Sequence, residues 1–266
     1  MLYIFKKLTT KTILKNLKPT ERFSDRVENY MKYRPGYPLE IIAFLKKECE
    51  LSDVSIIADI GSGTGILSKI FLDNGNKVFA VEPNKEMRNA AEKFFKQNKN
   101  FISIPSTAEN TELKTQNIDF IIAGQAFHWF DINKTKIEFK RILRNNGYVI
   151  LIWNSRISKE GFMNDYENLL LKFGTDYENV NHDNIDESVI KNFYSPYDYK
   201  EITFPNYQEF DYEGIKGRLL SSSYIPAEGS NNCCDMLNYL ENIFEKNNKK
   251  GKIKMEYKTV VYYGKL

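Results

Sequence analysis

A loop of three alternating glycines constrains this chain more than any other feature of its sequence. An apolar run covers residues 54–60, the glycines are Gly61, Gly63 and Gly65, and a helical pattern begins at Ile66. Glycines at alternate positions after a strand let the backbone turn tightly and pass close to a bound molecule. The sequence therefore predicts a strand, a tight loop and a helix, which together form the first half of a βαβ unit.

A second apolar run follows at the distance expected for the rest of that unit. Residues 78–81 are apolar, and Glu82 follows them, seventeen residues after Gly65. An acid at this point in a βαβ unit accepts hydrogen bonds from ribose hydroxyls. The alternative is a plain strand-to-helix turn without a ligand. Because the loop and the acid occur together, we expect a cofactor that contains adenosine.

The rest of the chain alternates in the same way. Strands are predicted at 54–60, 77–82, 101–105, 118–123 and 148–153, and helices at 23–34, 39–50, 66–74, 85–98 and 132–143. Beyond residue 153 the pattern predicts helices at 162–173, 187–193 and 233–246 within polar loops. It closes with two alternating runs, 252–257 and 259–263, which indicate a terminal hairpin or edge pair. Strands that are apolar throughout favour a mostly parallel sheet covered on both faces, an α/β fold.

Composition excludes several classes of protein. Hydrophobic residues make up 42% and charged residues 27%, as in ordinary globular proteins, and no uncharged apolar run is long enough to span a bilayer. The net charge of +3 is spread along the chain and gives no nucleic-acid footprint. Cys49, Cys233 and Cys234 fit neither a disulfide framework nor a zinc site. We therefore expect no metal and a reducing, cytoplasmic setting.

Residues 1–18 differ from the rest of the chain. They contain five lysines and no acidic residue, and the lysines interrupt any apolar core that a secretory signal would need. We interpret them as a loosely attached N-terminal extension. An amphipathic surface-binding helix or an organelle-targeting segment is the alternative.

Two residues distinguish the glycine loop from a dinucleotide site. In G-x-G-x-x-G loops the third glycine lets the helix pack closely on the strand, and here that position holds Ile66. Asp59, two residues before the loop, places a carboxylate at the strand tip, where a pyrophosphate would be repelled. A carboxylate there suits a ligand with an ammonium or sulfonium group. The pattern therefore argues against a nicotinamide-dependent oxidoreductase.

At this point the sequence resembles a known family. Residues 59–65 together with 81–84 resemble the class I S-adenosylmethionine-dependent methyltransferases, and the resemblance runs from Phe23 to the C-terminus. Other motifs are similar to the small-molecule branch with a methyltransferase type 11 domain, which includes trans-aconitate methyltransferase-like proteins. These motifs are Phe23-Ser24-Asp25-Arg26, Tyr30, Arg34-Pro35, Tyr37-Pro38, Thr107-Ala108-Glu109, Gln125-Ala126-Phe127-His128-Trp129-Phe130 and Ser221-Ser222-Ser223-Tyr224-Ile225-Pro226.

The resemblance implies S-adenosylmethionine as the cofactor and assigns residues to it. Asp59 would meet the amino group, and Glu82 would accept both ribose hydroxyls. The glycines would let the backbone approach the methionine and ribose part, and Gln125 would flank the methionine. The implied set is Tyr30, Arg34, Asp59, Gly61, Ser62, Gly63, Gly65, Glu82, Pro83, Ala108, Glu109 and Gln125. Ala108 and Glu109 would border the adenine, with an ordinary solvated loop as the alternative.

Tyr30 and Arg34 lie four residues apart and share a helical face. Arg34 would pair with the cofactor's carboxylate while Tyr30 covers it, so that the helix forms a lid. The alternative is that Arg34 is a surface cation at a helix end.

His128 and Trp129 are the candidate catalytic residues. A histidine after a strand's carboxyl end is placed for general-base work, but methyl transfer depends largely on orientation, so structural support of the loop is an equal alternative. Aromatic faces attract a sulfonium, so Phe127, Trp129 and Trp153 are candidates to line the transfer site or, alternatively, to form core. His182 supports no inference.

The predicted architecture is a Rossmann-like three-layer α/β/α domain over residues 19–266. Its seven-stranded, mostly parallel sheet would have an antiparallel last strand, as the family implies. The core would comprise about 40–153 and 231–266, with a cap for the acceptor at about 154–230. The sequence sets no oligomeric state.

The predicted function is methyl transfer to a small-molecule acceptor, with a carboxylate or a hydroxyl as its target left open. A catalytically silent cofactor-binding protein is the main alternative. Relatives that methylate amino groups of nucleic acids carry Asn/Asp-Pro-Pro-aromatic after the fourth strand. Here that place reads Gly124-Gln125-Ala126-Phe127, so we expect no nucleic-acid partner.

Overall fold

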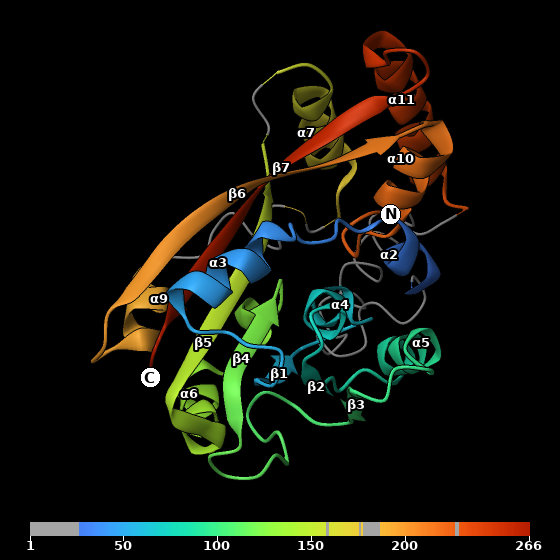
Figure 1. The fold of residues 1–266 in the computed structure, drawn as a ribbon. Helices are drawn as coiled ribbons and strands as arrows, with labels where there is room; N and C mark the ends of the chain where they lie inside the picture. The colour runs from blue at the N-terminus through green and yellow to red at the C-terminus, as the bar shows by residue number, and fades with distance from the viewer. Residues whose placement is uncertain (1–26, 158–159, 176, 178–186, 227–228) are drawn as a thin grey trace, which may run out of the picture.

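A seven-stranded sheet runs through the part of the molecule that the structure describes (Figure 1). The structure is a computed structural model that describes residues 27–157, 160–175, 177, 187–226 and 229–266. The strand order is β3-β2-β1-β4-β5-β7-β6. The strands are β1 (Ile56–Ile60), β2 (Lys77–Val81), β3 (Phe101–Ile104), β4 (Ile118–Gly124), β5 (Leu143–Arg156), β6 (Tyr199–Phe210) and β7 (Ile253–Gly264). The predictions for residues 1–18, for Phe23 to Arg26 and for His182 lie outside the described residues.

The first five strands are parallel, and β7 is antiparallel to its neighbours. β1 pairs in parallel with β2 on one side and with β4 on the other, and β4 pairs in parallel with β5. Strand order therefore reverses between β1 and β4, which opens a crevice at their carboxyl ends. β7 runs antiparallel to both β5 and β6, so the predicted antiparallel last strand is confirmed.

Helices cover both faces of this sheet. They are α2 (Val27–Tyr33), α3 (Glu40–Glu48), α4 (Ile66–Asp73), α5 (Lys85–Phe94), α6 (Ile132–Ile142), α7 (Gly161–Phe173), α9 (Glu187–Tyr194), α10 (Tyr212–Leu220) and α11 (Asn231–Asn247), with a 3₁₀ turn η2 (Phe127–Trp129). Ile57 of β1 packs with α3 and α4, whereas Ala58 packs in the cluster of α6 and α9. Because successive strand residues face opposite sides, apolar strands require helices on both, and the predicted three-layer fold is confirmed.

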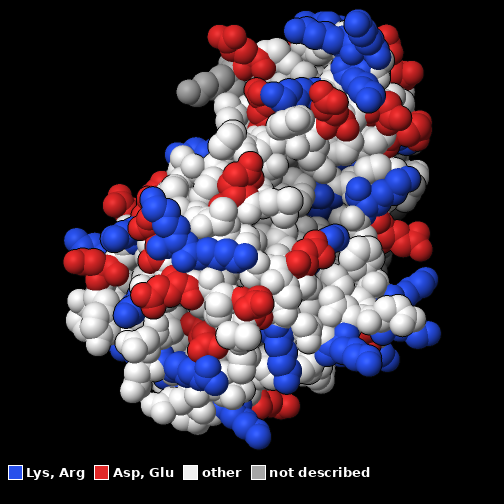
Figure 2. Space-filling view, viewed as in Figure 1, with Lys and Arg blue, Asp and Glu red and all other residues white. Residues whose placement is uncertain are grey.

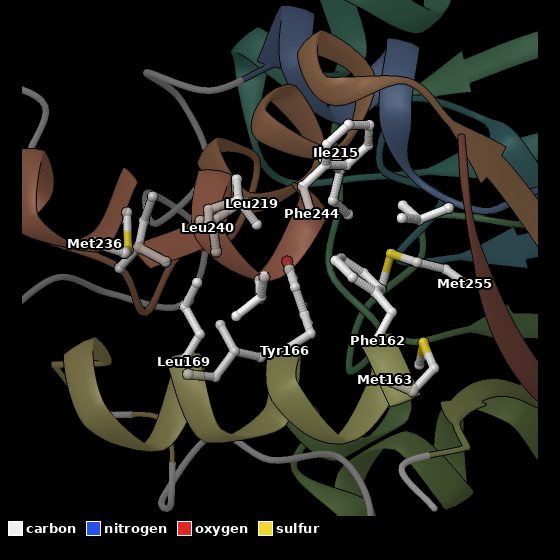
Figure 3. Close-up of a cluster of buried hydrophobic side chains, with 14 of the residues drawn as sticks. Phe162, Met163, Tyr166, Leu169, Ile215, Leu219, Met236, Leu240, Phe244 and Met255 are labelled. Atoms are coloured by element: carbon white, nitrogen blue, oxygen red, sulfur yellow. The ribbon is translucent and has the colours of Figure 1, made fainter. Parts of the chain in front are cut away.

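A separate apolar cluster forms a cap at the far ends of β6 and β7. α7, α10 and α11 surround it, and Ile253, Met255 and Tyr257 of β7 contribute to it. Figure 3 shows Phe162, Tyr166 and Leu169 pointing from α7 towards the helices opposite. The cap is therefore built on the same sheet as the core.

The sequence-based strand assignment was wrong at the C-terminal part. Residues 252–257 and 259–263 do not form a hairpin, because they belong to the single strand β7. Its partner β6 lies within 154–230, where no strand was predicted. β6 is an edge strand on which exposed and partly buried residues alternate, so it lacks the apolar run that marked the other strands. β5 also begins earlier than predicted, at Leu143.

Charged side chains of both signs are interspersed over the face shown in Figure 2. No helix within the described ranges is both long enough and apolar enough to cross a membrane. In the same ranges, no group of three or more histidine, cysteine or acidic side chains is placed to hold a metal ion.

The cap cluster yields a stability prediction. Leu169 is fully buried in α7, and Leu171 on the same helix is 52% exposed. We expect Leu169→Ala to lower the free energy of unfolding by about 2–5 kcal/mol, because it removes buried apolar surface and leaves a cavity. Leu171→Ala is the matched control and should change it by less than about 0.5 kcal/mol. Urea denaturation measures both, and equal effects would contradict the packing described here.

Candidate cofactor and acceptor site

A cavity of about 430 Å³ opens at the carboxyl ends of β1, β2 and β4, a volume typical of small-ligand sites. The structure brings most of the predicted site residues to its wall. These are Tyr30, Arg34, Asp59, Gly61, Ser62, Gly63, Glu82, Pro83, Ala108, Glu109, Gln125 and Trp129. Gly65 and His128 are not among its lining residues.

Glu82 holds the glycine loop in place. One carboxylate oxygen accepts a hydrogen bond of 2.8 Å from the backbone N–H of Gly63, and the other accepts one of 2.8 Å from that of Asn84. The loop is also tied to β2, because the N–H groups of Gly61 and Ser62 donate to the Val81 carbonyl. Burial raises the pKa of Glu82 although these amides oppose the shift. Each oxygen retains a lone pair for a further donor.

The three glycines serve different purposes. All have positive φ, which an L side chain adopts only at a cost. A Cβ on Gly63 would meet no atom within 4 Å, so the loop presents open backbone to the cavity there. A Cβ on Gly65 would lie 2.5 Å from the Phe95 ring. Glycine at position 65 is therefore required by the packing of Phe95, and the approach of its backbone to the cofactor stays a prediction.

Asp59 presents a carboxylate to the cavity from the end of β1. Its side chain is fully buried, and Oδ2 accepts a 2.6 Å hydrogen bond from the Ser68 hydroxyl. Among the described residues, Oδ1 has no hydrogen-bond partner. Burial raises the pKa of Asp59 to about 7, with Glu82 adding to the shift and Ser68 opposing it. A buried carboxylate oxygen without a donor is matched by a ligand N–H donor or cation.

Arg34 lies where α2 meets the cap. Its guanidinium packs over the Tyr30 ring at 4.9 Å from the ring centroid and donates to the Ser221 hydroxyl at 3.2 Å and to the Ser221 carbonyl at 3.0 Å. Burial and the nearby Arg218 lower the pKa of Arg34. These contacts place Arg34 inside the site rather than on the surface, in agreement with the interpretation of α2 as a cover.

Two loops complete the cofactor side of the cavity. Ala108 is buried, and the Glu109 carboxylate accepts a 2.9 Å hydrogen bond from the Asp131 N–H at the start of α6. Gln125 follows β4 with a positive φ, and its side-chain oxygen accepts a 3.2 Å bond from the Asn154 N–H. Gln125 thereby links the ends of β4 and β5 beneath the cavity.

The aromatic residues around η2 divide between core and cavity. Phe127 and Trp153 are almost fully buried and meet edge to face, so both belong to the core. Trp129 lines the cavity. Burial lowers the pKa of His128 to about 4, so the imidazole is neutral at pH 7. His128 is next to Trp129, with the two ring centroids 4.7 Å apart, so its role as base or as structural support stays a prediction.

Sequence reasoning missed the cap side of the cavity. Its lining also includes Tyr37, Phe130, Asn154, Arg156, Arg218, Ser223, Tyr224 and Tyr257. Tyr37, Phe130, Ser223 and Tyr224 lie within the motifs that carried the family resemblance, and this was the signal that could have found them. Arg156 and Arg218 had no such signal.

The fold and the cavity together define a Rossmann-like domain with a cofactor site at its topological switch point. Residues 58–151 match the family described as a methyltransferase domain. An uncharacterized methyltransferase of Schizosaccharomyces pombe is 30% identical over 151 residues, which cover 56% of this chain and 59% of that protein. An uncharacterized methyltransferase of Mycobacterium tuberculosis is 30% identical over 152 residues, covering 57% of this chain and 60% of that protein. The chain thus spans about three fifths of the length of these curated relatives.

Solved structures agree on the fold. A "Putative Type II Methyltransferase" from Anaeromyxobacter dehalogenans superposes with a TM-score of 0.66 at 17% identity, covering 88% of this chain and 98% of that one. The YcgJ protein of Bacillus subtilis gives a TM-score of 0.54 at 19% identity, covering 85% of this chain and 97% of that one. Residues 58–151 therefore form a methyltransferase domain, in agreement with the predicted class I S-adenosylmethionine-dependent family and its cofactor. The trans-aconitate methyltransferase-like branch stays a prediction.

The different environments of Gly63 and Gly65 yield a second prediction. Gly63→Ala should cost roughly 1–2 kcal/mol of stability for its positive φ, and its methyl group should lower the affinity for S-adenosylhomocysteine at least tenfold by entering the cavity. Gly65→Ala should cost roughly 2 kcal/mol or more, because overpacking against Phe95 adds to the backbone strain. Urea denaturation and titration calorimetry separate the two effects. A Gly63→Ala protein with unchanged affinity would contradict the assignment of this loop.

Proposed function

We propose that the protein is a methyltransferase that uses S-adenosylmethionine to methylate a small-molecule acceptor. The observation that carries the proposal is a single cavity lined both by the glycine-loop side of the sheet and by side chains of the cap. S-adenosylmethionine supplies an activated methyl group on its sulfonium when bound. A cap that faces this cofactor site gives the acceptor a place beside the donor.

The residues at the sheet end of the cavity suit the cofactor chemically. The unpartnered Oδ1 of Asp59 would accept from the amino group, and Arg34 would pair with the carboxylate. Glu82 would accept from the ribose hydroxyls through the lone pairs that the Gly63 and Asn84 amides leave. Ala108 and Glu109 would border the adenine, and the open face of Gly63 would admit the ligand next to backbone.

The residues at the cap end would orient the acceptor. Methyl transfer is an in-line displacement in which orientation supplies much of the rate. His128 stays a candidate base for an acceptor that must lose a proton, and structural support of its loop is the alternative. The acceptor atom, in a carboxylate or a hydroxyl, would be aligned by the cap side chains and by Trp129. A cavity of about 430 Å³ suits a small molecule rather than a nucleic acid.

The direct test measures turnover. The protein should release S-adenosylhomocysteine from S-adenosylmethionine in the presence of a panel of small carboxylic acids and phenols, and Glu82→Ala should abolish this release together with cofactor binding. Binding of S-adenosylhomocysteine without turnover on a broad panel would favour a catalytically silent binder. Absence of binding would refute the proposal.

The pKa of Asp59 gives a prediction about pH. The ligand's ammonium group needs the ionised carboxylate, so the affinity for S-adenosylhomocysteine should fall about tenfold from pH 8 to pH 6 as Asp59 is protonated around pH 7. The free energy of unfolding of the ligand-free protein should change in the opposite direction. Because folding raises the pKa of Asp59, the protonated carboxyl group stabilises the folded state, and this contribution is lost as the pH rises through 7. Calorimetric titration and thermal denaturation measure the two trends.

Asp59→Asn is the matched control for this effect. It should bind the ligand more weakly and with no pH dependence between pH 6 and 8. A wild-type affinity that stays constant over this range would contradict the role of Asp59.

A further inference from the structure

The charges that line the cavity are sorted by position. Its carboxylates within the described residues are Asp59, Glu82 and Glu109, which follow or end the strands β1, β2 and β3. Its cations are Arg34, Arg156 and Arg218, from the end of α2, the end of β5 and helix α10. The sheet end of the cavity is therefore acidic and the cap end is basic.

Arg218 is the least compensated of these cations. It is only 3% exposed, and among the described residues its Nε has no hydrogen-bond partner. Nη1 reaches the Ser222 hydroxyl at 3.4 Å, a weak contact. No carboxylate within the described residues forms an ion pair with it. A buried guanidinium with this little compensation is costly unless an anion binds it.

Arg156 is better compensated and adds to the same positive field. Its Nη2 lies 3.4 Å from Glu167 and also donates to the Tyr177 hydroxyl, while Nη1 reaches the Tyr224 hydroxyl at 3.4 Å. Glu167 thereby balances the charge of Arg156 and fixes its orientation. The Nε of Arg156 is buried and has no hydrogen-bond partner among the described residues.

The positive charges of three arginines act together on the phenol of Tyr224. Burial alone would raise the pKa of its phenol, yet Arg156, Arg218 and Arg34 lower it to about 8. At pH 7 the phenol is still mostly protonated, so it does not neutralise the arginines. It is instead a hydroxyl donor at the cap end of the cavity.

The cofactor accounts for only one of these cations. S-adenosylmethionine carries a single carboxylate, and the proposed function pairs it with Arg34. Arg34 lines the same cavity as Asp59, the residue assigned to the cofactor's amino group. With Arg156 paired to Glu167, the charge of Arg218 remains without a partner.

We propose that the methyl acceptor is an anion whose carboxylate or phosphate-ester group binds Arg218, with Arg156 and the Tyr224 hydroxyl beside it. This inference rests on the proposed function for its cofactor, and it adds the chemical class of the acceptor. The negative group anchors the acceptor at the cap end, so that another part of the molecule faces the donor.

The first test uses the full chain saturated with S-adenosylhomocysteine, so that the cofactor's carboxylate already occupies its own site. Three probes of similar shape are added at constant ionic strength: benzoate, phenyl phosphate and the uncharged benzamide. We expect benzoate or phenyl phosphate to raise the midpoint of thermal unfolding in a concentration-dependent manner, and benzamide to leave it unchanged. The anion that raises the midpoint shows whether the site binds a carboxylate or a phosphate ester. The proposal would be overturned if benzamide and both anions raised the midpoint of thermal unfolding equally, or if none of the three changed it.

The second test replaces the arginine. Arg218→Met should abolish the response to the anions while leaving the protein without anions at least as stable as the wild type, because an uncompensated buried charge is removed. Arg144→Gln is the matched control, since Arg144 forms an exposed ion pair with Asp119 and should keep the full response. A full response in Arg218→Met would overturn the proposal.

Arg218→Lys covers the case in which the methionine variant does not fold. It keeps the charge but loses the planar fork, so it should bind the active anion roughly tenfold more weakly. Wild-type affinity in this variant would overturn the proposal. Failure of the proposed function would look different, because S-adenosylhomocysteine itself would not bind. If S-adenosylhomocysteine binds and the anions do not, only the present inference fails.

Discussion

The two hydrogen bonds that Glu82 accepts are the contacts on which the site depends. They connect the end of β2 to the glycine loop at Gly63 and to the start of α5 at Asn84. They add to the backbone bonds from Gly61 and Ser62 to Val81 that tie the loop to β2. Because Glu82 is also buried, its charge is available to a bound ligand at little cost in reorganisation. One side chain thus shapes the loop and prepares it for binding.

The distribution of charge extends this principle across the whole cavity. Asp59 and Glu82 lie at the sheet end of the cavity, and the arginines lie at its cap end. A molecule whose charges were reversed relative to this arrangement would meet repulsion at both ends, so the arrangement favours one orientation of a charged ligand. Tyr37, Trp129 and Tyr257 also line the cavity and add apolar and hydroxyl surface to it.

The sequence predicted the sheet end of the molecule well because its signals there are local. Apolar strands, a glycine loop and an acid at fixed spacing determine β1, α4 and β2 with little help from the rest of the fold. The cap was predicted poorly because its signals are not local. Arg34 meets Ser221 across 187 positions of sequence, and the pattern of α10 does not reveal that Arg218 is buried. β6 was missed because an edge strand alternates polar and partly buried residues, as a loop with mixed composition also does.

The position of β7 in the sheet has a consequence for how the chain folds. β7 pairs with β5 and with β6, and its residues enter both the cap cluster and a core cluster. During synthesis the apolar edge of β5 is complete long before β7 exists, because α7, α9, β6, α10 and α11 are made in between. Strand pairs that are far apart in sequence form late in folding, so the unpaired edge of β5 is exposed to other chains until β7 pairs with it. The core and the cap are thereby coupled through one strand that is made after the others in the sheet.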